Sequence, residues 1–179
     1  MFHPDTQFLI DHWTRLSAGD GARAGVPSRA GFHPDALGLR LPRAFIADRL
    51  GHGGVLRLSG SWIEAFHAQA LKDRPFSCVW VEDSHALVRA AAVQAVREAR
   101  PVVVVALAGS IATPIEITLV PLRGRSGEVD RIAGLYAPSG SLSFAADDCR
   151  LLTARISIGV GPVARAPLAL AAVGGRRVA

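Results

Sequence analysis

The chain has 179 residues, half of them hydrophobic, which is enough for one sizeable core and favours one domain with extensions over two domains. Its two cysteines, Cys78 and Cys149, show no metal-ligand spacing, and a lone pair in a chain without a recognisable secretory signal indicates free thiols in the cytoplasm. The net charge is +5, but residues 150–179 contain five arginines and no acidic residue, so the rest is neutral overall and does not favour nucleic acid as a partner.

The first predicted element is an amphipathic helix over residues 6–17, with Thr6 as its candidate N-cap. Its apolar side chains fall at helical spacing: Phe8, Leu9, Trp13 and Leu16. This stripe is too wide for a helix alone in water, so we expect it to pack on its own domain or on a second copy, which would give a homodimer. A short helical turn at Pro34 follows, and Pro42 closes the N-terminal segment.

Two strands are predicted next, over residues 44–50 and 54–60, because apolar and polar side chains alternate on both sides of a Gly-rich turn. Short helical turns follow, the first with a capping box made by Ser61 and Glu64.

A longer helix is then predicted, capped by Asp83 or Ser84 and ending before Pro101. Apolar strands follow at residues 101–109, 115–124 and 128–138. Pro114, Glu116 and the turn chemistry of residues 109–114 argue against a membrane span here.

In this order, several strings resemble a PAS domain, and more narrowly a bacterial family of small single-PAS proteins with a helical N-terminal extension. The strings that carry the resemblance are Trp13, Pro27-Ser28-Arg29, Pro34, Leu41-Pro42, Leu56-Arg57-Leu58-Ser59-Gly60-Ser61, Arg74-Pro75-Phe76, Glu82-Asp83, Pro121-Leu122 and Asp130-Arg131-Ile132-Ala133-Gly134. The segment from Phe66 to Lys72 departs from the family pattern, which usually has glycines there.

The resemblance implies an α+β fold with a five-stranded antiparallel sheet, covered on one face by short helices and one long helix. The predicted parts are an N-terminal helical extension over 1–43, a PAS-like core over 44–137 and a basic, partly disordered tail over 138–179. A small ligand would lie between the helices and the sheet. The predicted lining residues are Leu58, Trp62, Phe66, Phe76, Trp80, Leu87, Val88, Ile117, Leu119 and Leu135.

No cofactor is assigned by these residues. A flavin photosensor would need a cysteine in an Asn-Cys-Arg string, whereas Cys78 lies in Phe76-Ser77-Cys78-Val79-Trp80. His85 is the histidine placed to be considered for haem, and the histidines show no metal-ligand spacing.

The sequence does not predict an enzyme. Residues 159–164 formally match a dinucleotide fingerprint, but prolines follow where a helix must begin, and no G-x-S-x-G elbow is present.

Two hypotheses remain. The first is a sensory or regulatory module that binds a small ligand or a protein partner and signals through altered contacts of its N-terminal helix. The second is a structural interaction protein without a ligand. Within the tail, the alternation in residues 151–160 predicts an added edge strand or a partner-docking segment, and we expect truncation at Gly161 to leave folding intact.

Overall fold

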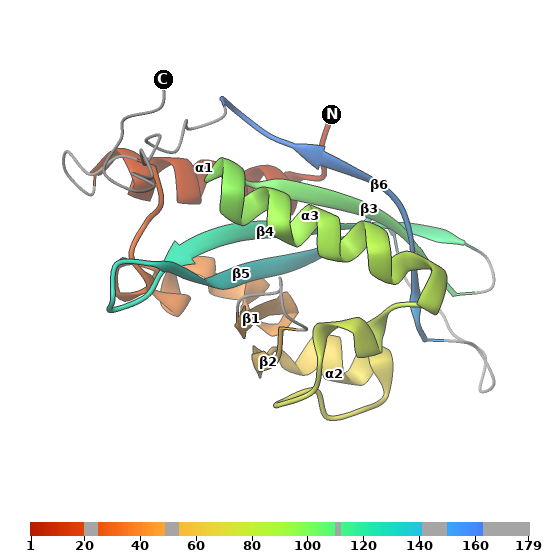
Figure 1. Ribbon diagram of the computed structural model, residues 1–179. Coiled ribbons are helices and arrows are strands. Elements are labelled where there is room, and N and C mark those ends of the chain that lie inside the picture. Colours follow the sequence, from red (N-terminus) through yellow and green to blue (C-terminus); the bar gives the residue numbers. More distant parts are fainter. Residues whose placement is uncertain (20–24, 49–53, 110–111, 141–149, 163–179) are drawn as a thin grey trace, which may run out of the picture.

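The computed structural model describes residues 1–19, 25–48, 54–109, 112–140 and 150–162. Its centre is an antiparallel sheet of six strands in the order β2-β1-β5-β4-β3-β6 (Figure 1). The strands are β1 (Ala44–Asp48), β2 (Leu56–Ser59), β3 (Val102–Ala108), β4 (Thr113–Arg123), β5 (Val129–Pro138) and β6 (Leu152–Gly159). The five strands expected within residues 44–138 are confirmed.

The sixth strand corrects the predicted strand count. β6 pairs antiparallel with β3, from Val102 opposite Gly159 to Ala108 opposite Leu152. The alternation in residues 151–160 therefore marks an edge strand of the sheet, which was one of its two predicted roles. The remainder of the predicted tail, residues 141–149 and 163–179, lies outside the described residues.

One face of the sheet, here called the inner face, is covered by α2 (Ser61–His67), α3 (His85–Glu98) and the 3-10 turn η4 (Phe76–Val79) (Figure 1). Alternation along the strands sends Val102, Val104 and Ala106 of β3 to this face. The buried residues of α3 are mostly alanines, which let the helix backbone lie close to β3 and β6. A large apolar cluster fills this side.

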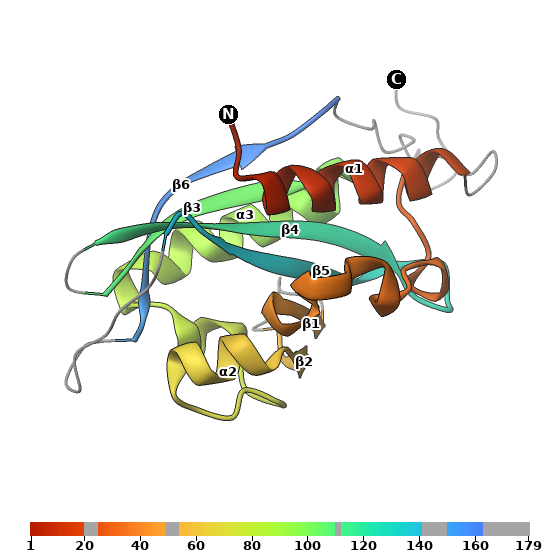
Figure 2. The same cartoon turned by 180° about the vertical axis from the view of Figure 1, so that it is seen from behind.

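The opposite face, here called the outer face, is covered by α1 (Pro4–Gly19) and by the 3-10 segments η1 (Arg29–Gly31) and η2 (Pro34–Arg43) (Figure 2). Leu9 and Trp13 of α1 are buried against β4 and β5. The indole N–H of Trp13 donates a 2.7 Å hydrogen bond to the carbonyl oxygen of Pro121. The apolar stripe of the N-terminal helix thus packs on its own domain.

The predicted helix caps are wrong in detail. α1 begins at Pro4, Thr6 is buried within it, and His3 Nδ1 accepts the backbone N–H of Asp5 (3.1 Å). Neither Ser61 nor Ser84 makes the expected side-chain cap.

The side chains of Glu64 and Ser84, which were expected to take part in caps, bond to groups outside their helices. Glu64 accepts the N–H of Leu71, and Ser84 Oγ accepts the N–H of Ala154 in β6. Within the described parts of the chain, no helix is long and apolar enough to cross a membrane.

Candidate functional site

The inner face gathers eight of the ten residues predicted to line a ligand site. Six are buried members of its apolar cluster and two are partly buried side chains packed against it. The eight are Phe66, Phe76, Trp80, Val88, Ile117 and Leu119, with Trp62 and Leu87 at the margin.

These side chains pack against one another as a core. Phe45 stacks on Phe76 with ring centroids 5.2 Å apart, and Trp62 stacks on Phe66 at the same distance. Phe45 also lies over Gly134, where a Cβ atom would come within 2.2 Å of the Phe45 ring. The glycine thus gives the ring its place in the core.

The other two predicted residues lie elsewhere. Leu135 belongs to the apolar cluster of the outer face, because odd and even positions of β5 point to opposite sides of the sheet. Leu58 is 54% exposed and lines a pocket on the outer face. Placing both residues in one site with Trp80 was therefore a wrong assignment of faces.

The inner core contains a buried polar pair that the sequence analysis missed. His67 Nδ1 lies 2.6 Å from the carbonyl oxygen of Arg150, and His67 Nε2 lies 3.3 Å from the hydroxyl of Tyr136. The carbonyl requires a donor, so the proton resides on Nδ1 and Nε2 accepts from the tyrosine. Burial lowers the pKa of His67 to about 4 and raises that of Tyr136, so both are neutral near pH 7.

The other candidate reactive side chains of the inner face, His85 and Cys78, are held by hydrogen bonds or made less reactive by burial. His85 Nε2 donates to the carbonyl oxygens of Ser77 (3.1 Å) and Trp80 (3.2 Å), which removes that nitrogen as a haem ligand. Burial raises the pKa of the Cys78 thiol and so disfavours the nucleophilic thiolate. Among the described residues, no three His, Cys, Asp or Glu side chains are grouped so as to hold a metal ion.

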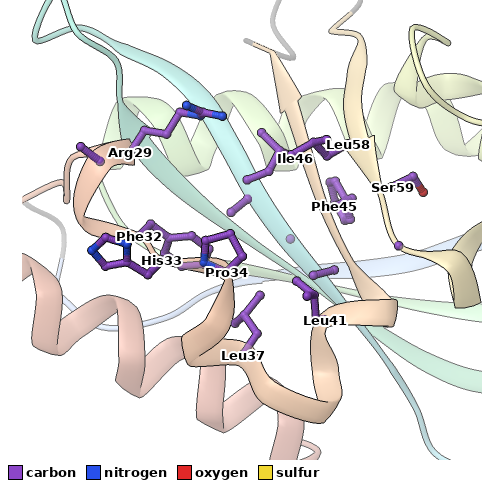
Figure 3. Close-up of a pocket in the computed structure, with 15 residues that line it drawn as sticks. Arg29, Phe32, His33, Pro34, Leu37, Leu41, Phe45, Ile46, Leu58 and Ser59 are labelled. Atoms are coloured by element: carbon purple, nitrogen blue, oxygen red, sulfur yellow. The ribbon is translucent and has the colours of Figure 1, made fainter.

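The outer face contains a pocket of about 460 Å³, here called the outer pocket, between η1 and η2 on one side and β1, β2 and β5 on the other (Figure 3). This volume falls in the range of small-molecule sites. It is lined by Arg29, Ala30, Phe32, His33, Pro34, Leu37, Leu41, Ala44, Phe45, Ile46, Leu58, Ser59, Gly60, Ala133 and Gly134. Small side chains on the sheet, at Ala44 and Ala133, leave room beneath the 3-10 segments, whereas η2 packs closely on Gly60, where a Cβ atom would come within 2.1 Å of the Pro42 carbonyl oxygen.

The polar groups around the outer pocket are few. The Arg29 side chain extends from η1 toward Ile46, whereas the His33 ring is turned away from the strands (Figure 3). No acidic residue occurs among the lining residues. Asp48, at the end of β1, is paired with Arg57 and with Arg131.

The wall of the outer pocket is connected to α1. Asp5 accepts hydrogen bonds from Arg40 Nε (2.7 Å) and lies 2.8 Å from Arg43 in an ion pair, and both arginines belong to η2. The Arg40 guanidinium also lies over the Phe8 ring, 4.0 Å from its centroid. These contacts connect η2 to the first turns of α1.

Arg29, Pro34 and Leu41 of the outer pocket belong to the strings that carry the PAS resemblance, but they were not predicted as lining residues. Along η2, Leu37, Leu39 and Leu41 are apolar at alternate positions, a spacing that predicts a strand and not the wall of a pocket. The pair His67 and Tyr136 had no local signal, since the two residues are 69 positions apart.

A family model described as a PAS domain matches residues 1–137, most of the chain. The chain therefore belongs to the PAS domain family, as the resemblance in its sequence predicted. No curated protein matches it.

The solved structures that are similar to this chain include two light-oxygen-voltage proteins. One is a light-oxygen-voltage domain studied with a flavin analogue, at 14% identity and a TM-score of 0.41, covering 55% of this chain and 78% of the other. The second is an RNA-binding light-oxygen-voltage receptor, at 16% identity and a TM-score of 0.43, covering 64% of this chain and 36% of the receptor. Flavin and RNA are properties of those two proteins.

Proposed function

We propose that this PAS domain is a sensory module that binds a small ligand in the outer pocket and signals through the contacts of its N-terminal segment. PAS domains are sensory or regulatory modules, and the chain belongs to that family. The observation that carries the proposal is the position of the pocket, with the N-terminal segment as one wall and the sheet as the other. A bound molecule contacts both walls and changes the stability of their association.

The contacts of Asp5 with Arg40 and Arg43 link the pocket wall to α1, and through them a change at the pocket reaches the N-terminal helix. Leu37 and Leu41 line the outer pocket on η2, and Arg40 of the same segment is bound to Asp5 of α1. The signal then passes to a partner protein that contacts α1 or η2. Leu39 of η2, which is 94% exposed, is available for such a contact.

The proposal is one of binding and not of catalysis. The polar side chains that line the pocket are Arg29, His33 and Ser59, without a carboxylate to form an acid–base pair with the histidine. A cytoplasmic location and a bacterial source stay predictions from the sequence.

The test combines thermal unfolding and amide hydrogen exchange of the full chain with a panel of nucleotides, fatty acids and aromatic acids. A ligand at about 100 times its dissociation constant stabilises the fold by about 2.7 kcal/mol. We expect at least one compound to raise the melting temperature and to slow exchange in residues 4–43. L58W narrows the pocket and should weaken both effects, whereas L39W, at an exposed position of η2 that does not line the pocket, should not.

Two outcomes contradict the proposal. One is a panel that leaves the melting temperature unchanged throughout. The other is a compound that binds but slows exchange only in residues 76–98, because that result returns the ligand to the inner face.

A second candidate function is an interaction protein that binds no ligand. It is favoured by the close packing of the inner face and by three exposed leucines, Leu39 and Leu41 on η2 and Leu58 on β2. Under this alternative, L58W and L39W both change the sedimentation coefficient, and no compound stabilises the protein.

A further inference from the structure

We propose that the outer pocket selects an amphipathic monocarboxylate, with the apolar body of the molecule in the pocket and its carboxylate on the guanidinium of Arg29. The inference deepens the proposed function, because it names the class of ligand for the same site. It rests on the apolar walls of the pocket, on the side chain of Arg29 and on the absence of acidic residues from the lining.

The first observation is the polarity of the walls. Leu37 and Leu41 on η2 face Ile46 and Leu58 on the strands across the pocket (Figure 3). A volume of about 460 Å³ between such side chains accommodates an alkyl chain or an aromatic ring rather than a sugar or a nucleotide, which would lose hydrogen bonds to water there.

The second observation is the state of the one guanidinium. Arg29 is exposed, and within the described residues it has no ion-pair partner. Four other arginines, on η2 and on the strands, are engaged: Arg40 and Arg43 with Asp5, and Arg57 and Arg131 with Asp48. A carboxylate matches the two-pronged geometry of an arginine and meets no acidic residue among those that line the pocket.

The third observation is that no acidic side chain lines the pocket, which argues against a cationic ligand and favours a monoanion. No carboxylate lines the pocket to bind an amine, and one guanidinium balances one negative charge. A ligand that carried two or three phosphate charges would leave most of them without a partner. The matching molecule has one carboxylate at the end of an apolar body.

The experiment measures the affinity of the full chain for decanoate and for decanamide by isothermal titration calorimetry at low ionic strength. The two probes share the same alkyl chain, so their difference isolates the carboxylate. The variants are R29Q, R29K and, as a matched control, R155Q, which removes an exposed arginine from β6 at the other edge of the sheet. L58W reports on the apolar part of the site.

We expect decanoate to bind about 10-fold or more tightly than decanamide, since a hydrogen bond to a charged group is stronger than one between neutral groups. R29Q should remove this preference, R29K should keep part of it, and R155Q should leave it unchanged. L58W should weaken both probes alike. Added salt should weaken decanoate alone.

Three results overturn the inference in distinguishable ways. Equal affinities for the two probes, both weakened by L58W, contradict the carboxylate but keep the outer pocket as the ligand site. A preference for decanoate that survives R29Q places the carboxylate elsewhere. Failure of both probes and of the wider panel to bind contradicts the proposed function as well, and a change in sedimentation with L58W would then identify a protein interface.

Discussion

The two faces of the sheet are covered by different kinds of structure. On the inner face, α2, η4 and the strands contribute large rings, and the Phe45 ring contacts those of both Phe76 and Tyr136. On the outer face, α1 covers β4 and β5, while the neighbouring strands are covered by 3-10 segments that stand over alanine and glycine. The inner face is a core, and the outer face keeps a pocket.

This comparison shows that the face covered by α2 and α3 is not the face that contains the pocket. Aromatic side chains of α2, η4 and the strands fill the inner volume, so a ligand there must displace buried rings. The outer pocket already has a volume of about 460 Å³. We therefore propose that sensing takes place on the outer face and that the inner face supplies stability.

The largest expected effect is the loss of stability caused by a substitution in the core of the inner face. W80A removes a side chain that is 2% exposed and should destabilise the protein by about 3–5 kcal/mol, the usual cost of truncating a buried aromatic residue. L58A, on the outer pocket, should cost well under 1 kcal/mol because Leu58 is largely exposed. Chemical denaturation measures both values. Similar losses in the two variants would contradict the division between core and pocket.

The next effect is the acid sensitivity of the inner face. Burial lowers the pKa of His67 to about 4, whereas the unfolded chain takes up this proton near pH 6.5. The contribution of neutral His67 to stability is therefore fully present above pH 6.5 and is lost as the pH falls toward 4. Below pH 4 this residue causes no further change in stability. The loss is about 3 kcal/mol.

H67Q keeps a donor for the Arg150 carbonyl and an acceptor for Tyr136 but cannot titrate. Between pH 7 and pH 4, the unfolding free energy of the wild type should fall by about 3 kcal/mol more than that of H67Q. A constant difference across this range would show that His67 is not a buried neutral imidazole.

A smaller effect compares one tryptophan from each face. Trp13 donates its indole hydrogen bond to Pro121, whereas the indole nitrogen of Trp80 is buried and has no partner in the described parts of the chain. W13F should cost about 1–3 kcal/mol more than W80F, because only the first substitution breaks a buried hydrogen bond. Equal losses in urea titrations would mean that the Trp13 bond contributes little.

The smallest effect concerns the end of the chain. Removal of residues 162–179 should change the unfolding free energy by no more than about 0.5 kcal/mol, since β6 ends at Gly159. A chain that ends at Ser143 lacks β6 and exposes β3, so we expect it not to fold. Thermal unfolding of the two truncated proteins gives the comparison, and a large loss in the longer one would contradict it.

Much of the fold follows from local patterns in the sequence. The valines after Pro101 and the alternation in β1, β2 and β6 predict strands, and the small residues of α3 predict a helix that lies close to the sheet. The predicted caps were wrong, because Glu64 bonds to Leu71 beyond the end of α2 and Ser84 bonds to Ala154 in β6. Such contacts are not encoded at fixed local spacing.

The candidate site was less predictable than the fold. Alternation determines which residues share a face, but one misplaced register moved Leu135 to the wrong side. The outer pocket depends on the path of η2, where Gly38 adopts a positive φ of 51° and interrupts the helical turns. No periodicity in the sequence reveals a wall of that kind.

The most direct test of the central claim follows two isoleucine methyl groups by NMR while decanoate is added to the full chain. Ile46 lines the outer pocket, and Ile117 lies fully buried in the inner core. We predict that the Ile46 methyl signal shifts in a saturable way while the Ile117 signal stays in place. A saturable shift of Ile117 with no change at Ile46 would contradict the account and place the ligand on the inner face.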